Sequence, residues 1–232
     1  MDCFQIKGLN GTYLVYRALF APVKSNMYIL IKDSEAVVID PCVSEDALKL
    51  LNEKGVSYVS ILLTHEHYDH TNGVKWMQSH MASTLYCQKY CAASIAIEKR
   101  NNPTLVALVL ADQDKADGGS RYKDFRKNFQ PYSLKADVTF ENEVEWALGE
   151  FKVKGISTPG HSPGSCFYFI DERVAFSGDS LLEDKKVILT FRNGSEADYE
   201  EITRPFLKSL DKNIMLLPGH GEPFMIKDAK YL

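Results

Sequence analysis

The sequence contains no hydrophobic segment that approaches the ~20 apolar residues needed to cross a membrane. Its N-terminal stretch, MDCFQIKGLNGTYLVY, also lacks the basic start and apolar run that are typical of an export signal. The five cysteines are odd in number and scattered, which does not resemble a disulfide framework. We therefore expect a protein of the reducing cytoplasm that does not associate with a membrane.

The chain also lacks an excess of basic residues. Its 27 Lys and Arg residues are outnumbered by 31 Asp and Glu residues, which gives a formal net charge of -4. Because nucleic-acid phosphates select basic surfaces, this balance argues against nucleic acid as the main partner. The length of 232 residues and the 45% hydrophobic content are sufficient for a buried core. The composition thus predicts a globular protein.

Strand and helix patterns alternate along the first 70 residues. Aromatic and β-branched residues in TYLVYRALF, NMYILIK and EAVVID predict strands. The segment SEDALKLLNEKG predicts a helix that begins after Ser44 and ends at Gly55. YVSILLT then predicts a buried strand that leads directly into THEHYDH. This alternation indicates an α/β fold and places THEHYDH at the C-terminal end of a strand, where α/β proteins tend to bind ligands.

The rest of the chain continues this pattern with one exception. Helices are predicted for TNGVKWMQSHM, for CQKYCAASIAIEKR and, with an irregularity at Pro205, for SEADYEEITRPFLKSL. Strands are predicted for VTFEN, EVEWAL, FKVKGIST, SCFYFI, RVAFSGD and NIMLLPGHG. The exception is residues 101–135, where the apolar TLVALVL precedes a run of mixed charge. We interpret this segment as an insertion that caps the active site, within a single domain of residues 1–232.

Three of the six histidines stand within seven residues, in THEHYDH at positions 64–70. Neither helix nor strand propensity favours such a cluster, whereas a metal ion requires one. His65 and His67 are two residues apart, so in an extended segment both side chains point the same way and can bind one metal. Asp69 and His70 lie where the chain begins to turn and can bind a second metal.

Three further candidate ligands follow predicted strands and stand beside glycines. They are His161 in STPGHSPGS, Asp179 in AFSGDSLL and His220 in LLPGHGEP. Asp179 can bridge two ions because its carboxylate has two oxygens. Nitrogen and carboxylate ligands without thiolates fit zinc best, with iron or manganese as alternatives. The sequence therefore predicts two divalent metal ions, and only His80, in a predicted helix, is left out of the pattern.

The order of these motifs resembles that of the metallo-β-lactamase superfamily. An aspartate after an early strand, Asp40, is followed by THEHYDH, GHSPGS, SGDSL and PGHG, and together they extend over almost the whole chain. The resemblance implies an α/β fold of the metallo-β-lactamase type, a four-layer αββα sandwich with the metals at one edge between the sheets. It also implies that Asp40 supports the ligands from behind and that Glu66 and Tyr68 lie outside the ligand set.

The same resemblance divides the ligands between two metals. It implies a first metal on His65, His67 and His161, a second on Asp69, His70 and His220, and a bridge formed by Asp179.

The segment TPGHSPGS is most similar to the glyoxalase II branch, which hydrolyses thioesters and small esters. About a dozen residues follow His220, so we expect the C-terminal region with which glyoxalase II binds glutathione to be absent. The resemblance implies a hydrolase of a small thioester, lactone or related ester that uses a metal-bound hydroxide. Asp69 is the candidate catalytic residue, which orients the nucleophile and helps to move its proton.

Two other functions remain open. A mononuclear-iron oxidoreductase, similar to the persulfide dioxygenases of this superfamily, would need only the first metal. A metal-binding protein without catalysis is the other alternative. The basic residues of the insertion, Arg121, Lys123, Arg126 and Lys127, either meet an anionic substrate or form a solvated face. Arg192 is a further candidate for a position near the pocket.

Overall fold

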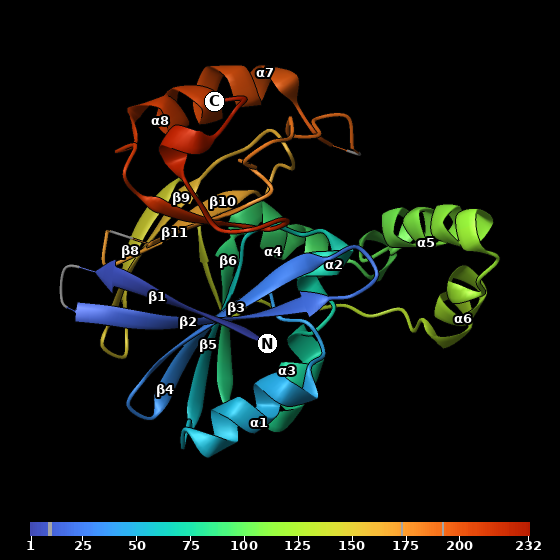
Figure 1. Ribbon diagram of the computed structural model, residues 1–232, viewed down its shortest axis with the longest axis horizontal. Coiled ribbons are helices and arrows are strands. Elements are labelled where there is room, and N and C mark those ends of the chain that lie inside the picture. The colour runs from blue at the N-terminus through green and yellow to red at the C-terminus, as the bar shows by residue number, and fades with distance from the viewer. Residues whose placement is uncertain (9–10, 173, 192) are drawn as a thin grey trace.

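The computed structural model describes residues 1–8, 11–172, 174–191 and 193–232, and in this part of the chain two β-sheets lie face to face with helices outside them (Figure 1). The first sheet has seven strands in chain order: β1 (Asp2–Gly8), β2 (Gly11–Phe20), β3 (Ser25–Lys32), β4 (Glu35–Ile39), β5 (Tyr58–Leu63), β6 (Ser83–Gln88) and β7 (Val138–Phe140). The second has six, in the order β13 (Phe224–Met225), β12 (Met215–Pro218), β11 (Val174–Gly178), β10 (Cys166–Ile170), β9 (Phe151–Ser157) and β8 (Glu143–Leu148).

Both sheets combine antiparallel strands with parallel ones. In the first sheet β4, β5 and β6 run parallel, and in the second β11 and β12 do. Strand β9 has the direction of β11, because both are antiparallel to β10, which lies between them. Polar loops follow the C-terminal ends of β4, β5, β9, β11 and β12, and these loops carry every candidate ligand.

The alternation of side chains along the strands divides the core into layers. Tyr28 and Leu30 of β3 point between the sheets, whereas Met27 and Ile29 pack against the outer helices. In the same way, Tyr168 of β10 faces the other sheet, while its neighbours in the strand face outward. Because both faces of the sheets are covered at their centres, the central strands β3 and β10 are almost continuously buried.

Helices complete the two outer layers. Helices α1 (Glu45–Glu53), α3 (Val74–His80) and α4 (Lys89–Ile95) pack on the first sheet, and α7 (Glu196–Asp198), the π-helical turn η2 (Tyr199–Thr203) and α8 (Arg204–Ser209) cover the second. This confirms the predicted four-layer αββα sandwich. No helix in the described ranges is both long and apolar enough to cross a membrane.

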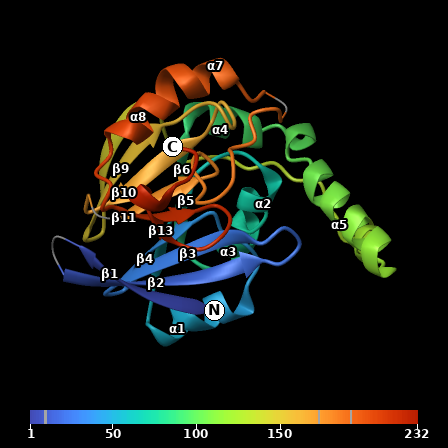
Figure 2. The ribbon, with the colours of Figure 1, turned by 45° about the horizontal axis from the view of Figure 1, so that its top comes forward.

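The segment between β6 and β7 contains helices that leave the sandwich. After α4, the 3-10 helix η1 (Glu98–Arg100) leads into α5 (Thr104–Asp117), which packs against α6 (Arg121–Asn128). Both α5 and α6 extend away from the two sheets on one side (Figure 1), and Figure 2 shows the same for α5. The ring of Phe125 on α6 returns to the body of the protein, where it packs edge-on against Tyr68 at 5.9 Å between centroids.

The structure corrects one detail of the predicted elements and confirms another, the irregularity at Pro205. Cys87 does not lie on a helix with Cys91: it belongs to β6, which the β-forming residues of STLYC build beside β5. The last helical segment changes to a π-helical turn before Pro205, and Pro205 then occupies the first turn of α8. That position suits proline, because the first N–H groups of a helix need no partner within it. The short β13 and the 3-10 helix η3 (Ile226–Asp228) were not predicted.

The layer between the sheets supplies a test of stability. Phe176 is fully buried there beside Tyr28, and Phe176→Ala should lower the free energy of unfolding by about 3–5 kcal/mol because it leaves a cavity. Leu19→Ala is the control, since Leu19 is 46% exposed, and it should cost less than about 1 kcal/mol. Urea denaturation measures both values. Equal effects of the two substitutions would contradict this account of the core.

Candidate metal centre

The loops of the first sheet contribute four candidate ligands in one short stretch. His65 follows β5, and His67 precedes the short helix α2 (Tyr68–Thr71), which carries Asp69 and His70. His65, Asp69 and His70 are almost completely buried, although all three are polar. Buried polar groups need partners, so the neighbours of these side chains indicate what the site can do.

The second sheet contributes the remaining candidates at the same edge. His161 lies in the loop between β9 and β10, Asp179 directly follows β11, and His220 follows β12. The structure thus brings all seven predicted residues together, although they span positions 65 to 220. His80, which the sequence pattern excluded, lies on the exposed side of α3, away from the others.

Three histidines form the first group, which we call the three-histidine cluster. His67 Nδ1 lies 3.1 Å from His65 Nε2 and 3.0 Å from His161 Nε2. Zinc–nitrogen bonds of ~2.0–2.1 Å in tetrahedral geometry would place ligand nitrogens ~3.3 Å apart. The three nitrogens therefore have the spacing of ligands around one small cation.

Asp69, His70 and His220 form the second group, the carboxylate cluster. Asp69 Oδ2 lies 3.3 Å from His70 Nε2 and 3.2 Å from His220 Nε2. Asp179 faces both clusters: its Oδ2 is 3.6 Å from His161 Nε2 and 3.5 Å from His220 Nε2, and its Oδ1 is 3.7 Å from His70 Nε2. One carboxylate thus lies between the two clusters, the position that a bridging ligand would need.

Two buried atoms of this group have no hydrogen-bond partner among the described residues: His70 Nε2 and Asp179 Oδ1. Gly219 lies so close that a Cβ on it would collide with Asp179 Oδ1 and approach the His70 ring. A buried nitrogen and a buried carboxylate oxygen that face each other without a hydrogen bond match the ligands of a divalent cation. The residues present therefore fit metal ions.

Asp40 orients His70 and fixes the Thr64 backbone that precedes His65. Its Oδ2 lies 2.9 Å from His70 Nδ1, which leaves Nε2 as the ring nitrogen that faces the site. Its Oδ1 accepts a hydrogen bond of 2.7 Å from the Thr64 backbone N–H, and Oδ2 one of 2.5 Å from the Thr64 hydroxyl. Asp40 adopts φ +49°, a left-handed conformation that aspartate tolerates better than most residues. The position matches the supporting role that the family resemblance implied.

Side chains of the first sheet hold the loop that carries His220. Asn26 Nδ2 donates to the carbonyl of Pro218 at 2.8 Å and to that of Gly221 at 2.9 Å. The Tyr28 hydroxyl also donates to Pro218, and buried Arg17 donates to Gly221 at 3.2 Å. His220 is therefore positioned by both sheets, although it belongs to the second.

Burial keeps the three-histidine cluster neutral. It lowers the pKa of His65 and His161 below the usual value and that of His67 to about 3, and the neighbouring imidazoles add to the effect at His65 and His67. His161 is oriented by its Nδ1, which lies 2.9 Å from the Ile188 carbonyl. Neutral imidazoles have lone pairs available for a cation near pH 7.

The carboxylate cluster has the opposite electrostatics. Burial opposes protonation of His70, but Asp69, Asp179 and Asp40 outweigh it and raise the His70 pKa well above its usual value. Burial likewise opposes protonation of His220, but Asp179 and Asp69 outweigh it and raise the His220 pKa. Against the effect of burial, the histidines lower the pKa of Asp69 and Asp179. Without a metal these groups form a protonated, ion-paired cluster, and a divalent cation would replace the protons.

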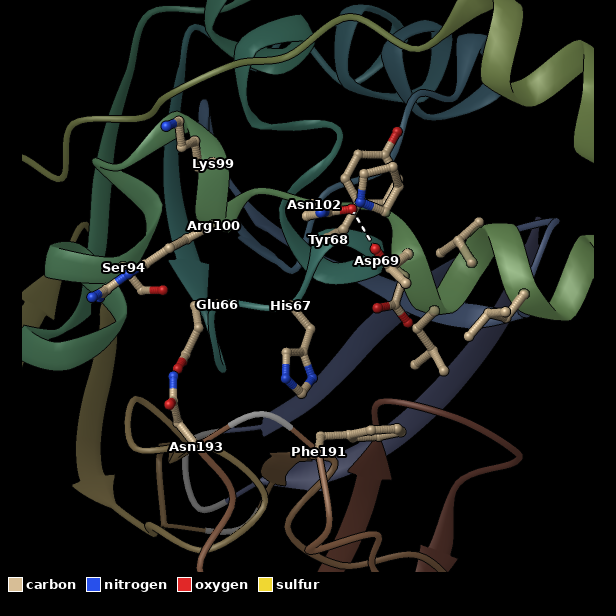
Figure 3. Close-up of a pocket in the computed structure, with 15 residues that line it drawn as sticks. Glu66, His67, Tyr68, Asp69, Ser94, Lys99, Arg100, Asn102, Phe191 and Asn193 are labelled. Atoms are coloured by element: carbon tan, nitrogen blue, oxygen red, sulfur yellow. Dashed lines mark hydrogen bonds between the residues drawn. The ribbon is translucent and has the colours of Figure 1, made fainter.

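A cavity of about 390 Å³ opens beside the two clusters, and His67 and Asp69 line it (Figure 3). Glu66 and Tyr68, expected outside the ligand set, also line the cavity and belong to neither cluster. Phe191 closes one side, with its ring 5.6 Å from the rings of both His67 and His161. Sequence reasoning did not identify Phe191, because nothing in the local pattern brings residue 191 to the site.

The basic residues proposed for the insertion do not reach this cavity. Arg121, Lys123, Arg126 and Lys127 of α6 are all exposed and do not line it, so they form the solvated face that was the alternative. Arg121 pairs instead with Asp117 at 2.6 Å. Lys99 and Arg100, which the sequence analysis did not single out, line the cavity. Arg192 lies outside the described residues.

Residues 21–220 match the model of the Metallo-beta-lactamase superfamily, and the chain belongs to this superfamily. Probable metallo-hydrolase YqgX of Bacillus subtilis is 26% identical to the chain over 202 residues, which cover 86% of each protein. A hydroxyacylglutathione hydrolase of Prochlorococcus marinus is 28% identical over 201 residues, which cover 84% of this chain and 64% of the relative. These similarities support, at this coarse level, a metal-dependent hydrolase.

Solved structures agree with this assignment of the fold. The crystal structure of BLEG-1 B3 metallo-beta-lactamase has a TM-score of 0.69 and 25% identity, and the match covers 92% of this chain and 95% of that one. ETHE1 from Myxococcus xanthus has a TM-score of 0.66 and 19% identity, with 93% and 81% covered.

The neutral three-histidine cluster makes the metal-free protein sensitive to acid. The pKa of His67 is about 3 in the folded state and ~6.5 in an unfolded chain, so stability falls as the pH drops from 6.5 towards 3. Because the unfolded chain binds a proton at His67 and the folded protein does not, the free energy of unfolding should be about 2 kcal/mol lower at pH 5 than at pH 7.5. His67→Asn should remove most of that loss.

Urea denaturation of the chelator-treated protein at pH 7.5 and pH 5 measures the difference. His80→Asn is the matched control, because His80 is exposed and distant from the cluster, and it should keep the parental pH dependence. If the His67 variant loses as much stability on acidification as the parent does, the cluster is not held neutral by its surroundings.

Proposed function

We propose that this protein is a dinuclear metal-dependent hydrolase of a small thioester, lactone or related ester, similar to the glyoxalase II branch. One observation carries the proposal: the three-histidine cluster and the carboxylate cluster lie side by side beside a cavity, and Asp179 faces both. The similarity to a hydroxyacylglutathione hydrolase supports a thioester. A cavity of about 390 Å³ suits a small molecule.

His65, His67 and His161 would hold one ion, Asp69, His70 and His220 the second, and Asp179 would bridge them. This donor set of imidazoles and carboxylates fits zinc best, with iron or manganese as alternatives. Bound divalent ions supply Lewis acidity and lower the pKa of a coordinated water from ~15.7 towards ~7.

Asp69 is the side chain best placed to act on the nucleophile. It lines the cavity, and the neighbouring histidines keep it ionised by holding its pKa well below the usual value. An ionised carboxylate accepts a hydrogen bond from a water molecule, orients it and takes up its proton. Its low pKa makes Asp69 a weak base, so orientation is its main contribution.

Other residues prepare the site for the reaction. The Phe191 ring covers the edges of His67 and His161 and excludes water from that side of the three-histidine cluster.

We also propose that residues 1–232 act as one domain in which the 101–135 insertion caps the cavity. This proposal is supported by Asn102 and the first turns of α5, which form one wall of the cavity.

The alternative function, a mononuclear-iron oxidoreductase, would use the three-histidine cluster alone. That cluster is complete without the second sheet's Asp179 and His220. The hydrolase is the better-supported proposal, because the carboxylate cluster is equally well formed and contains His70 Nε2, a buried nitrogen that makes no hydrogen bond within the described residues.

Elemental analysis and hydrolysis assays of His67→Ala test the proposal. Parental protein purified without added metal should contain about two divalent ions per chain and hydrolyse members of a panel of thioesters and lactones. Loss of His67 removes the ligand at the centre of the three-histidine cluster. The variant should lose at least one ion, and its kcat/KM should fall by more than about 100-fold.

His80→Ala should change neither the metal content nor the activity, since His80 is exposed outside the site. Unchanged metal content and hydrolysis in His67→Ala would show that the ligands are wrongly assigned. About one iron per chain, with oxygen uptake in the presence of a persulfide, would replace the hydrolase by the alternative.

A further inference from the structure

The cavity beside the metal centre has two chemically different ends. In Figure 3, Ser94, Lys99 and Arg100 lie on one side of His67, and Asp69 and Tyr68 lie on the other. Helix α5 passes on the side of Asp69. A substrate whose reacting bond lies at the metal centre would therefore extend in two directions into unlike surroundings.

One end carries positive charge that the protein offsets only in part, through the attraction between Arg100 and the Glu66 carboxylate. Lys99 and Arg100 are exposed on η1, and in the described part of the chain neither side chain makes a hydrogen bond or an ion pair. Glu66 is the acidic lining residue on this side, and its Oε2 accepts a hydrogen bond of 2.9 Å from the Ser162 hydroxyl. Two cations against one carboxylate leave this end of the cavity positively charged.

Neutral donors add to this preference. Ser94 and Asn193 line the cavity on the side of Arg100 and offer hydroxyl and amide groups. Arginine binds carboxylate and phosphate through parallel N–H groups, and lysine contributes a point charge.

The other wall is apolar. Leu105, Val106 and Leu108 of α5 line the cavity, and Leu105 and Leu108 are 38% and 63% exposed. Phe191 faces the same cavity from the loop between β11 and α7. Large apolar side chains that remain exposed inside a cavity are typical of a surface that a ligand covers.

We propose that the substrate has two arms: an apolar arm that lies along α5, and an anionic arm, ending in a carboxylate or phosphate, that Arg100 and Lys99 bind. This inference rests on the proposed function, because it takes the reacting ester or thioester bond to lie at the metal centre. It defines the substrate class as amphipathic and anionic, and it makes Arg100 and Lys99 the residues that determine specificity.

Matched thioesters test the anionic arm. Hexanoyl thioesters of 3-mercaptopropionate, 2-mercaptoethyl phosphate and 3-mercaptopropionamide share the acyl chain and differ in the charge of the thiol arm. We expect kcat/KM of the zinc-loaded protein to be about 10-fold higher or more for an anionic probe than for the amide. The carboxylate and phosphate probes identify the preferred anion. The S-hexyl monothioester of glutarate and its amide test the reverse orientation.

Substitutions then assign the preference to its residues. Arg100→Gln and Lys99→Gln should each reduce the ratio of anionic to neutral kcat/KM several-fold, and the double variant should bring it close to one. Lys115→Gln is the matched control: Lys115 is exposed on α5 outside the cavity, so its variant should keep the parental rates and ratio. A parental ratio near one in both orientations, or a ratio that the double variant leaves unchanged, would overturn the inference.

Binding separates this inference from the proposed function. Heptyl thioethers of the same thiols cannot be hydrolysed, and calorimetry measures their affinity for the zinc-loaded protein. The anionic thioethers should bind about 10-fold more tightly than the amide, and the double variant should remove the difference. If no probe is hydrolysed but this difference is present, the inference stands and the proposed hydrolase fails. If hydrolysis occurs without any preference for the anion, the hydrolase stands and the inference fails.

Discussion

The docking of the two sheets at one edge is the constraint on which the candidate site depends. Neither cluster is complete within one sheet: the three-histidine cluster takes His161 from the second sheet, and the carboxylate cluster takes His220. The approach is fixed by the apolar layer between the sheets and by hydrogen bonds across it, such as the one of 3.0 Å from the Tyr168 hydroxyl to the Leu63 carbonyl. The ligands thus lie on loops, but the loops are attached to rigid, buried strands.

The two clusters differ in their protonation when no metal is bound. The imidazoles of the three-histidine cluster are kept neutral by burial, so that cluster is ready for a cation. The carboxylate cluster balances ionised aspartates against histidines with raised pKa values. A metal-dependent hydrolase benefits from both environments, because one position holds an ion without competition from protons while the other places negative charge beside the cavity.

Much of the fold and of the clusters could be predicted, because the information is local. Runs of aromatic and β-branched residues mark the buried strands, and the spacing of His65 and His67 fixes which way their side chains point. The order of motifs along the chain then identified the family and its sandwich. The cavity wall was not predictable in this way. In the sequence, Lys99 and Arg100 look like ordinary surface cations. They lie beside the metal centre only because the fold places η1 and α5 at the wall of the cavity.

The separation of the ligands in sequence has a consequence for how the chain reaches its native state. His65 and His161 are almost a hundred residues apart, and His220 lies a further sixty residues along the chain. Contacts over such distances form late in folding, because they require the closure of long loops. Neither complete cluster exists before the sheets dock, so a divalent ion would bind only the docked state and draw the folding equilibrium towards it. A bound ion would then stabilise the docked arrangement of the two sheets over the separated one.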